Sequence, residues 1–139
     1  MADELKRLNL ELTSRCNYAC VGCPTHNLIR GKGAIEPELF RAILDEVGNN
    51  LEKIFLWGYG EPLLHPDIGE LVRYAGRFPI KKVMSTTGWK LEDLADLESL
   101  GHLDELILSI DGLTQEVYSK YQINGDLQKV IKGIRKVAP

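Results

Sequence analysis

Residues 8–24, LNLELTSRCNYACVGCP, join a strand-like segment to a loop that holds all three cysteines of the chain. Leu8, Leu10 and Leu12 alternate with polar residues, which is the two-residue period of a β-strand. The cysteines follow at positions 16, 20 and 23 in a CxxxCxxC spacing. We therefore predict a strand that runs directly into a ligand-rich loop as the first unit of the fold.

Three more segments repeat this order of strand, loop and helix. The further strands are predicted over residues 53–57, 80–86 and 105–110. The helices after the four strands are predicted over 37–47, 68–75, 91–100 and 114–137, the last with a break at Gly125-Asp126. Helical crossovers favour a parallel sheet with right-handed connections. We predict an α/β fold with four βα units of a parallel sheet in a single domain, 1–139.

Composition excludes several classes of protein. The chain of 139 residues has a net charge of −3 and a pI near 5.6, so it lacks the basic footprint of a nucleic-acid-binding protein. No apolar run approaches the roughly 20 residues that span a membrane, and the charged N-terminus lacks the apolar core of a signal peptide. Three cysteines leave one thiol over in any disulfide framework. Reduced cysteines in an unexported chain indicate a cytoplasmic protein.

Four loops follow the predicted strands, and each contains small or polar residues. They are the cysteine loop, GYGEP (58–62), STTG (85–88) and SIDG (109–112). In parallel α/β sheets, ligands bind at the carboxyl ends of the strands. The chemistry of this chain is therefore expected along one edge of the sheet.

The cysteines allow three interpretations. In the first, the cysteines are reduced thiols in a packed loop. In the second, they form a structural zinc site with His26 as the fourth ligand, and in the third they bind an iron–sulfur cluster. Zinc sites usually take ligands from two separated pairs, whereas all four candidates here lie in one loop. A four-iron cluster usually has four cysteine ligands, so three would leave one iron open to a substrate or cofactor.

Taken together, the CxxxCxxC, GYGEP, STTG and SIDG loops resemble the motifs of the radical S-adenosylmethionine superfamily. Within this superfamily, the motifs CxGCP and GEPLLHPD most resemble the branch that contains molybdenum-cofactor synthesis enzymes and peptide or protein maturases. The resemblance implies a (β/α)6 partial barrel. Because this chain has only four such units, we expect it to be truncated after the fourth, with a missing C-terminal half or a second chain completing the barrel.

The resemblance also implies an activity and its cofactors. It implies an oxidoreductase in which a 4Fe-4S cluster, reduced by a donor such as flavodoxin or ferredoxin, cleaves S-adenosylmethionine to a 5′-deoxyadenosyl radical that removes hydrogen from a substrate. Cys16, Cys20 and Cys23 would hold the cluster, and no catalytic residue is assigned beyond it. The residues implied to bind S-adenosylmethionine are Gly22, Gly58, Gly60, Glu61, Ser85, Ser109 and Asp111.

Individual roles follow from chemistry and position. A glycine-rich loop with Glu61 suits the methionine ammonium. Ser109 and Asp111, two apart on a predicted strand, would share one face and reach the ribose or carboxylate. Thr87 stands where relatives lead us to expect asparagine. Gln122 or Lys120 stands near a position where many relatives have an arginine for the cofactor carboxylate. The alternatives are a non-catalytic electron-transfer or assembly module and a zinc-stapled structural domain.

Overall fold

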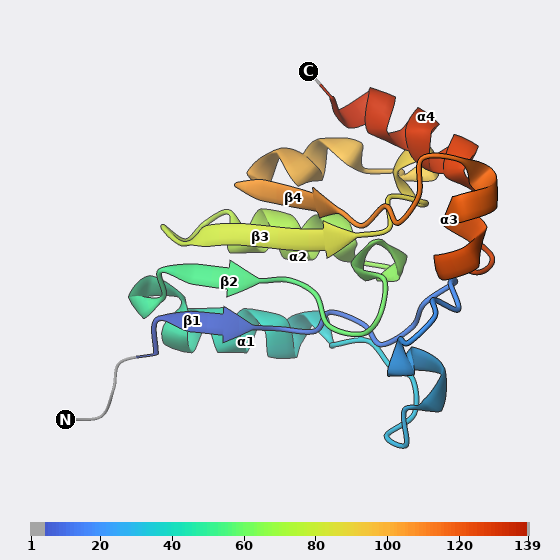
Figure 1. Ribbon diagram of the computed structural model, residues 1–139. Coiled ribbons are helices and arrows are strands. Elements are labelled where there is room, and N and C mark those ends of the chain that lie inside the picture. Colours follow the sequence, from blue (N-terminus) through green and yellow to red (C-terminus); the bar gives the residue numbers. More distant parts are fainter. Residues whose placement is uncertain (1–4, 139) are drawn as a thin grey trace.

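Four parallel strands form one sheet in the order β1-β2-β3-β4 in the computed structural model, which describes residues 5–138 (Figure 1). Each strand pairs in parallel with the next one along the chain. The bounds are Arg7–Asn9 for β1, Lys53–Phe55 for β2, Lys81–Thr86 for β3 and Glu105–Leu108 for β4. The predicted α/β class and parallel sheet are confirmed.

Three strands, β1, β2 and β4, end earlier than their sequence pattern suggests, and β1 shows why. The Leu10 N–H still donates to the Phe55 carbonyl at 2.8 Å, but Leu12 accepts a hydrogen bond from Ile35 instead of continuing the sheet. Thr13 forms an antiparallel bridge with Ala34. The chain leaves the sheet there because this returning segment pairs with residues 12–14 and closes the base of the cysteine loop.

The helices mostly follow their capping signals. They are α1 Pro37–Val47, α2 Ile68–Ala75, α3 Gln115–Tyr121 and α4 Leu127–Val137. Pro37 occupies the first turn of α1, where its missing N–H is not needed. The break predicted at Gly125-Asp126 is confirmed, since the Asp126 side chain accepts a hydrogen bond from the Lys129 N–H at 3.1 Å and caps α4.

The helix predicted over 91–100 is wrong. Two short 3₁₀ helices, η4 Leu91–Asp93 and η5 Leu97–His102, replace it. Leu91, Leu94, Leu97 and Leu100 recur every three residues, which matches the three residues per turn of a 3₁₀ helix rather than the 3.6 of an α-helix. All four leucines belong to the core or pack against it.

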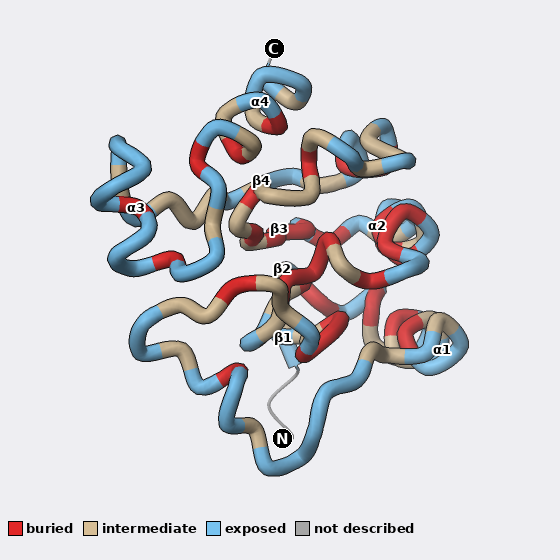
Figure 2. Tube along the Cα trace, turned by 90° about the vertical axis from the view of Figure 1, so that its right-hand side faces the viewer, coloured by how far each residue is buried: buried red, intermediate tan, exposed pale blue. Residues whose placement is uncertain are grey.

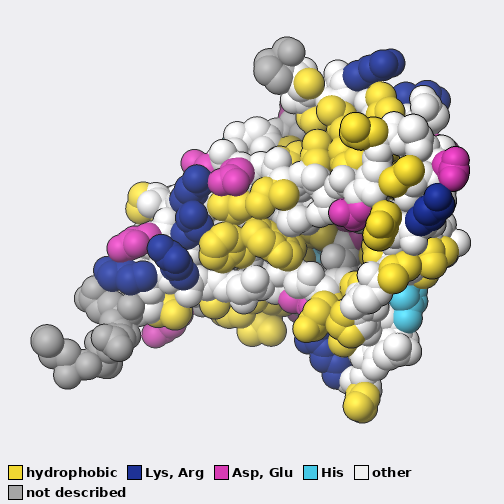
Figure 3. Space-filling model, in the orientation of Figure 1, with side chains coloured by type: hydrophobic (Ala, Val, Ile, Leu, Met, Phe, Trp, Pro, Cys, Tyr) yellow, Lys and Arg dark blue, Asp and Glu magenta, His cyan; other side chains and the backbone are white. Residues whose placement is uncertain are grey.

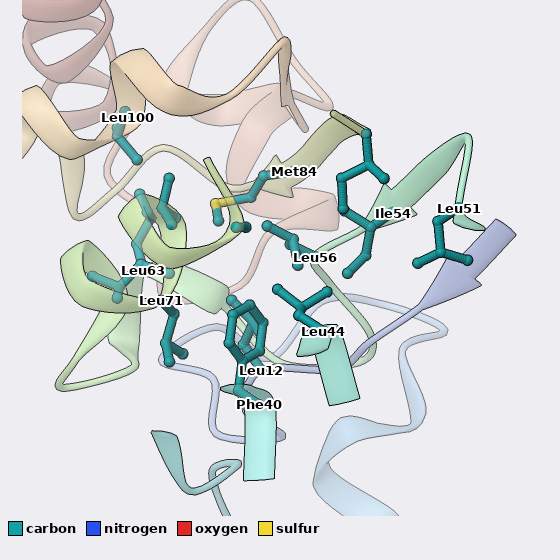
Figure 4. Packing of buried hydrophobic residues seen from close by; sticks show 14 of the residues in the cluster. Leu12, Phe40, Leu44, Leu51, Ile54, Leu56, Leu63, Leu71, Met84 and Leu100 are labelled. Carbon is teal, nitrogen blue, oxygen red and sulfur yellow. The ribbon is translucent and has the colours of Figure 1, made fainter. Parts of the chain in front are cut away.

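The main core lies between the sheet and helices α1 and α2, which sit behind the strands in Figure 1. Figure 4 shows its leucines, Ile54, Phe40 and Met84 packed against one another. Each such side chain contributes about 1.5–3 kcal/mol when it leaves water. Figure 2 shows buried segments along the strands and α2, whereas most of the loop before α1 is exposed.

The opposite face of the sheet differs from the helix-covered face. In Figure 3 apolar side chains gather over β3 and β4, and charged side chains lie toward the amino ends of the strands. Lys81 and Glu105 form an ion pair at 3.1 Å at those ends. Within residues 5–138, no helix has the length and apolar character that crossing a bilayer requires.

Candidate functional site

The four loops at the carboxyl ends of the strands are connected by hydrogen bonds. We call these loops, residues 16–27, 58–62, 85–88 and 109–112, the loop rim. Thr25 Oγ1 donates to the Tyr59 carbonyl at 2.5 Å and joins the cysteine loop to GYGEP. The Ser85 and Ser109 hydroxyls lie 3.2 Å apart and join STTG to SIDG. The rim therefore brings together loops that are far apart in the sequence, as predicted.

The cysteine loop is shaped by one glycine and by contacts with the end of α3. Gly22 has φ = 80°, a left-handed conformation that suits glycine, and the Cys23 N–H donates to the Cys20 carbonyl at 3.1 Å across this turn. The N–H groups of Ala19 and Val21 donate to the carbonyls of Ile123 and Tyr121. The thiols are consequently presented by a braced loop rather than a free one.

The GYGEP loop lies directly against the backbone that leads into Cys16. The Glu61 N–H donates to the Arg15 carbonyl at 2.9 Å. A Cβ at Gly60 would collide with the Thr13 carbonyl oxygen, and this oxygen is backbone that cannot turn aside. Glycine at position 60 is therefore required for the two loops to approach each other.

Both oxygens of the buried Glu61 carboxylate are engaged inside the protein. Oε1 accepts from Thr86 Oγ1 at 2.5 Å and from the Leu63 N–H at 3.1 Å. Oε2 accepts from both the N–H and the Oγ1 of Thr87, each at 2.8 Å. This geometry differs from an open carboxylate waiting for an ammonium group, because Glu61 ties GYGEP to STTG. The unusual Thr87 supplies two of its donors.

Sequence reasoning missed Glu11 and Trp57. Glu11 Oε2 accepts from the Tyr59 N–H at 2.8 Å, and its other oxygen pairs with Arg30 at 2.5 Å. It braces GYGEP from the β1 side, opposite the brace that Glu61 forms on the β3 side. In the sequence, the alternation around β1 indicated only that Glu11 is a polar residue on the outer side of a strand. Trp57 was only the last residue of the predicted strand over 53–57.

A hollow of about 120 Å³ opens between the ends of β2, β3 and β4. Its walls include Trp57, Gly58, Gly60, Glu61, Ser85, Thr86, Thr87 and Ser109. Asp111 does not line this hollow. The expectation that Ser109 and Asp111 share a strand face fails because β4 ends at Leu108, so neither residue lies in the strand. Asp111 is exposed, and its charge acts on Cys20 and Tyr118.

Neither candidate substitute for a carboxylate-binding arginine lines the hollow. Gln122 is buried, and its Nε2 donates to the Ser109 carbonyl at 2.7 Å, while its Oε1 has no hydrogen-bond partner among the residues that the structure describes. Lys120 is exposed and pairs with Glu116 one turn away on α3, at 3.0 Å. Gln122 therefore braces SIDG against α3, and Lys120 belongs to the outer surface.

Comparison with known proteins now identifies the family. The family model described as the radical SAM superfamily matches residues 10–138. The chain belongs to the radical SAM superfamily.

Two curated relatives agree with the branch suggested by the sequence. A probable GTP 3′,8-cyclase of Methanococcus maripaludis is 31% identical over 136 residues, which cover 96% of this chain and 45% of the relative. The mycofactocin maturase MftC of Mycobacterium tuberculosis is 31% identical over 133 residues, which cover 94% of this chain and 34% of the relative. The chain thus spans less than half the length of either relative. The leaning toward molybdenum-cofactor synthesis enzymes and maturases is confirmed.

Solved structures agree on the fold. Streptococcus suis SuiB superposes with a TM-score of 0.77 at 19% identity, over 96% of this chain and 30% of SuiB. A structure of BtrN in complex with AdoMet and 2-DOIA gives 0.69 at 20% identity, over 95% of this chain and 56% of BtrN. Both solved structures share the α/β fold of this chain, which fits four βα units of a partial barrel.

The radical SAM superfamily uses a 4Fe-4S cluster and S-adenosylmethionine, and the thiols of this chain fit such a cluster. Burial raises the pKa of Cys16, and it raises that of Cys20 to about 11, with further contributions from the neighbouring thiols and Asp111. Nearby negative charge attracts a positively charged metal centre, and such a centre deprotonates the thiols that bind it.

The zinc interpretation requires the three thiols and His26 around one metal ion. Among residues 5–138, no three His, Cys, Asp or Glu side chains are grouped around a single metal-ion position. His26, the fourth ligand of the zinc interpretation, uses its Nε2 in a hydrogen bond to the Tyr18 carbonyl at 2.7 Å. In a four-iron cluster each cysteine binds a different iron, so the sulfurs do not converge on one point.

Proposed function

We propose that this chain is the cluster-binding portion of a radical SAM enzyme, with Cys16, Cys20 and Cys23 as the ligands of a 4Fe-4S cluster. When bound, the cluster and S-adenosylmethionine together supply reductive cleavage of the sulfonium, which yields the 5′-deoxyadenosyl radical that abstracts hydrogen. The observation that carries the proposal is the braced loop that presents every thiol of the chain beside the GYGEP loop.

The rim residues receive S-adenosylmethionine in this proposal. Backbone carbonyls at Gly58 and Gly60 would accept from the methionine ammonium, and Glu61 holds that loop in place through its bonds to STTG. The Ser85 and Ser109 hydroxyls offer donors from the wall of the hollow. Gly22 would offer only backbone to the adenine, and Asp111, whose charge raises the pKa of Cys20, would bind a ribose hydroxyl.

We also propose that further polypeptide, from the same protein or from a second chain, completes the barrel. The outer backbone groups of β4 form one edge of the described sheet. An apolar cavity of about 560 Å³ lies beside this strand, bordered by η5 and α4. Unpaired strand edges favour association with another strand. A reduced flavodoxin or ferredoxin would supply the electron, and the free thiols fit a reducing cytoplasm.

The test is anaerobic reconstitution with iron and sulfide, followed by addition of S-adenosylmethionine and dithionite. We expect about four irons per chain, a change in the EPR signal of the reduced cluster when the cofactor is added, and 5′-deoxyadenosine as a product. A cluster that neither binds nor cleaves the cofactor would instead support an electron-transfer or assembly module. Stoichiometric zinc in place of iron would support the structural alternative.

A further inference from the structure

A pair of buried tyrosines joins the cysteine loop to α3. Tyr18 lies between Cys16 and Cys20, and Tyr118 lies in the middle of α3. Their hydroxyl oxygens are 3.0 Å apart across a separation of 100 residues. The rings meet edge to face, with centroids 6.4 Å apart and an interplanar angle of 86°. Both side chains are at most 1% exposed.

This pair forms the centre of a small second core. Leu127 and Val130 of α4 complete its buried part, and Cys16 and Cys20 pack against it. A Cβ at Gly125 would lie 2.5 Å from the Tyr118 ring, so glycine at this position leaves room for the ring. Cys16 and Cys20 therefore pack against a surface whose shape depends on the positions of the two tyrosine rings.

Two backbone hydrogen bonds just after Tyr18 in the sequence act together with the pair. The Ala19 N–H donates to the Ile123 carbonyl at 3.1 Å, and the Val21 N–H donates to the Tyr121 carbonyl at 2.9 Å. The loop thus runs alongside the end of α3 rather than against the sheet. The tyrosine hydroxyl pair reaches from this segment into the middle of the helix.

We propose that Tyr18 and Tyr118 are positioning residues that fix Cys16 and Cys20 for cluster binding, an inference that rests on the proposed function. The pair works through packing and one buried hydrogen bond, and it touches no reacting atom. Removing one hydroxyl leaves the other buried without its partner, which destabilises the folded chain. Removing both hydroxyls leaves no such unpaired group. The loop and α3 consequently depend on both members of the pair.

The first test uses the cluster-free chain and the substitutions Tyr18→Phe, Tyr118→Phe and both together. Amide hydrogen exchange of Ala19 and Val21 is followed by NMR, with circular dichroism to verify folding. Each single substitution should accelerate exchange by roughly threefold to tenfold, and the double substitution by no more than the larger single effect. Tyr74→Phe is the matched control, since its hydroxyl bonds Asp45 on the distant α1. Exchange rates equal to the control would overturn the proposal.

The second test separates positioning from simple stabilisation. The variants are reconstituted to full iron content, and the EPR spectrum and midpoint potential of the reduced cluster are compared with those of the wild type. We expect both to shift in the tyrosine variants and not in Tyr74→Phe, because the surroundings of the cysteine sulfurs set the potential. Unchanged EPR spectra and midpoint potentials would show that the tyrosine pair stabilises the fold without positioning the cysteines. A wild-type chain that forms no four-iron cluster would overturn the proposed function, while the exchange experiment would still decide whether the pair holds the loop.

Discussion

The helix-covered side of the sheet and the loop rim are built from different kinds of contact. The former is a continuous apolar core of leucines, isoleucines and Phe40 packed against α1 and α2. The rim buries polar groups instead, among them Thr25, Glu61 and Thr86, and the buried Gln122 beside it donates to the Ser109 carbonyl. Its loops are held by directed hydrogen bonds, each of which needs a particular partner.

This difference determines how each region responds to change. An apolar core tolerates exchanges of similar volume, because its attraction is not directional. A buried hydrogen-bond network loses more when one member is removed, since the remaining partner stays buried and unpaired. The rim should therefore be sensitive to conservative substitutions that the core would absorb, and the following predictions test this contrast in order of expected effect.

The largest effect is expected from replacing any one of Cys16, Cys20 or Cys23 by alanine. Two remaining thiolates hold a four-iron cluster poorly, so iron and sulfide should fall from about four of each per chain to near zero. The measurement is iron and sulfide analysis after anaerobic reconstitution, with the folded state verified by circular dichroism. A variant that keeps its full complement of iron would show that the missing thiol is no ligand.

Gly60→Ala should destabilise the fold by about 1–3 kcal/mol, because the new methyl group meets the Thr13 carbonyl, which is backbone. Gly58→Ala should destabilise the fold by a similar amount, since its methyl group would lie 2.6 and 2.7 Å from Cγ and Cβ of Glu11 as well as against the carboxylate. Urea unfolding measures both. Gly101→Ala is the control because, among the described residues outside its own turn of helix, no atom lies within 4 Å of its added Cβ. Equal unfolding free energies for all three variants would contradict the close packing of GYGEP.

Glu61→Gln should lower the free energy of unfolding by roughly 1.5–3 kcal/mol, the usual range for a lost hydrogen bond to a charged group. The amide keeps the shape of the side chain but offers a donor where Thr87 also donates. S-adenosylmethionine affinity should fall with it, as measured by calorimetry on the reconstituted chain. Glu46→Gln, on the exposed surface of α1, is the control. Unchanged stability would mean that the network contributes nothing.

Ser109→Ala and Asp111→Ala should leave the fold and the iron content intact and weaken S-adenosylmethionine binding by about threefold to a hundredfold. The Ser109 hydroxyl lines the hollow, and Asp111 stands near Cys20. Ser119→Ala, on the outer side of α3, serves as the control. Wild-type affinity in both variants would remove these residues from the site.

The smallest effect is expected at the amino ends of the strands, away from the rim. The Lys82 N–H, at 2.8 Å, lowers the pKa of Asp104 below its ordinary 3.8. The carboxylate therefore stabilises the fold above that pH and loses this contribution as the pH falls through the lowered value. Asp104→Asn should cost only about 0.5 kcal/mol at neutral pH, because the group is largely solvated. Urea unfolding at pH 6 and pH 2 checks this, and a difference that persists at pH 2 would contradict it.

The sequence predicted the core more fully than the rim. Alternation and helix periods located all four strands and the helices α1, α2, α3 and α4, because local pattern and burial agree there. The stretch of leucines spaced by three was misread, since spacings of three and four both suggest an α-helix. The motifs located the loops and the cysteines of the site. The role of Glu61 within the rim and the brace by Glu11 depend on contacts between distant segments, which no local pattern encodes.

The contact between Tyr18 and α3 has a consequence for synthesis of the chain on the ribosome. The cysteines emerge with the first unit, but the helix that holds their loop follows 100 residues later. At about 5–20 residues per second, the loop waits about 5–20 s for its support. During that interval the thiols are exposed to oxidants and to adventitious metals. Cluster delivery is therefore expected to follow translation of the fourth unit rather than accompany that of the first.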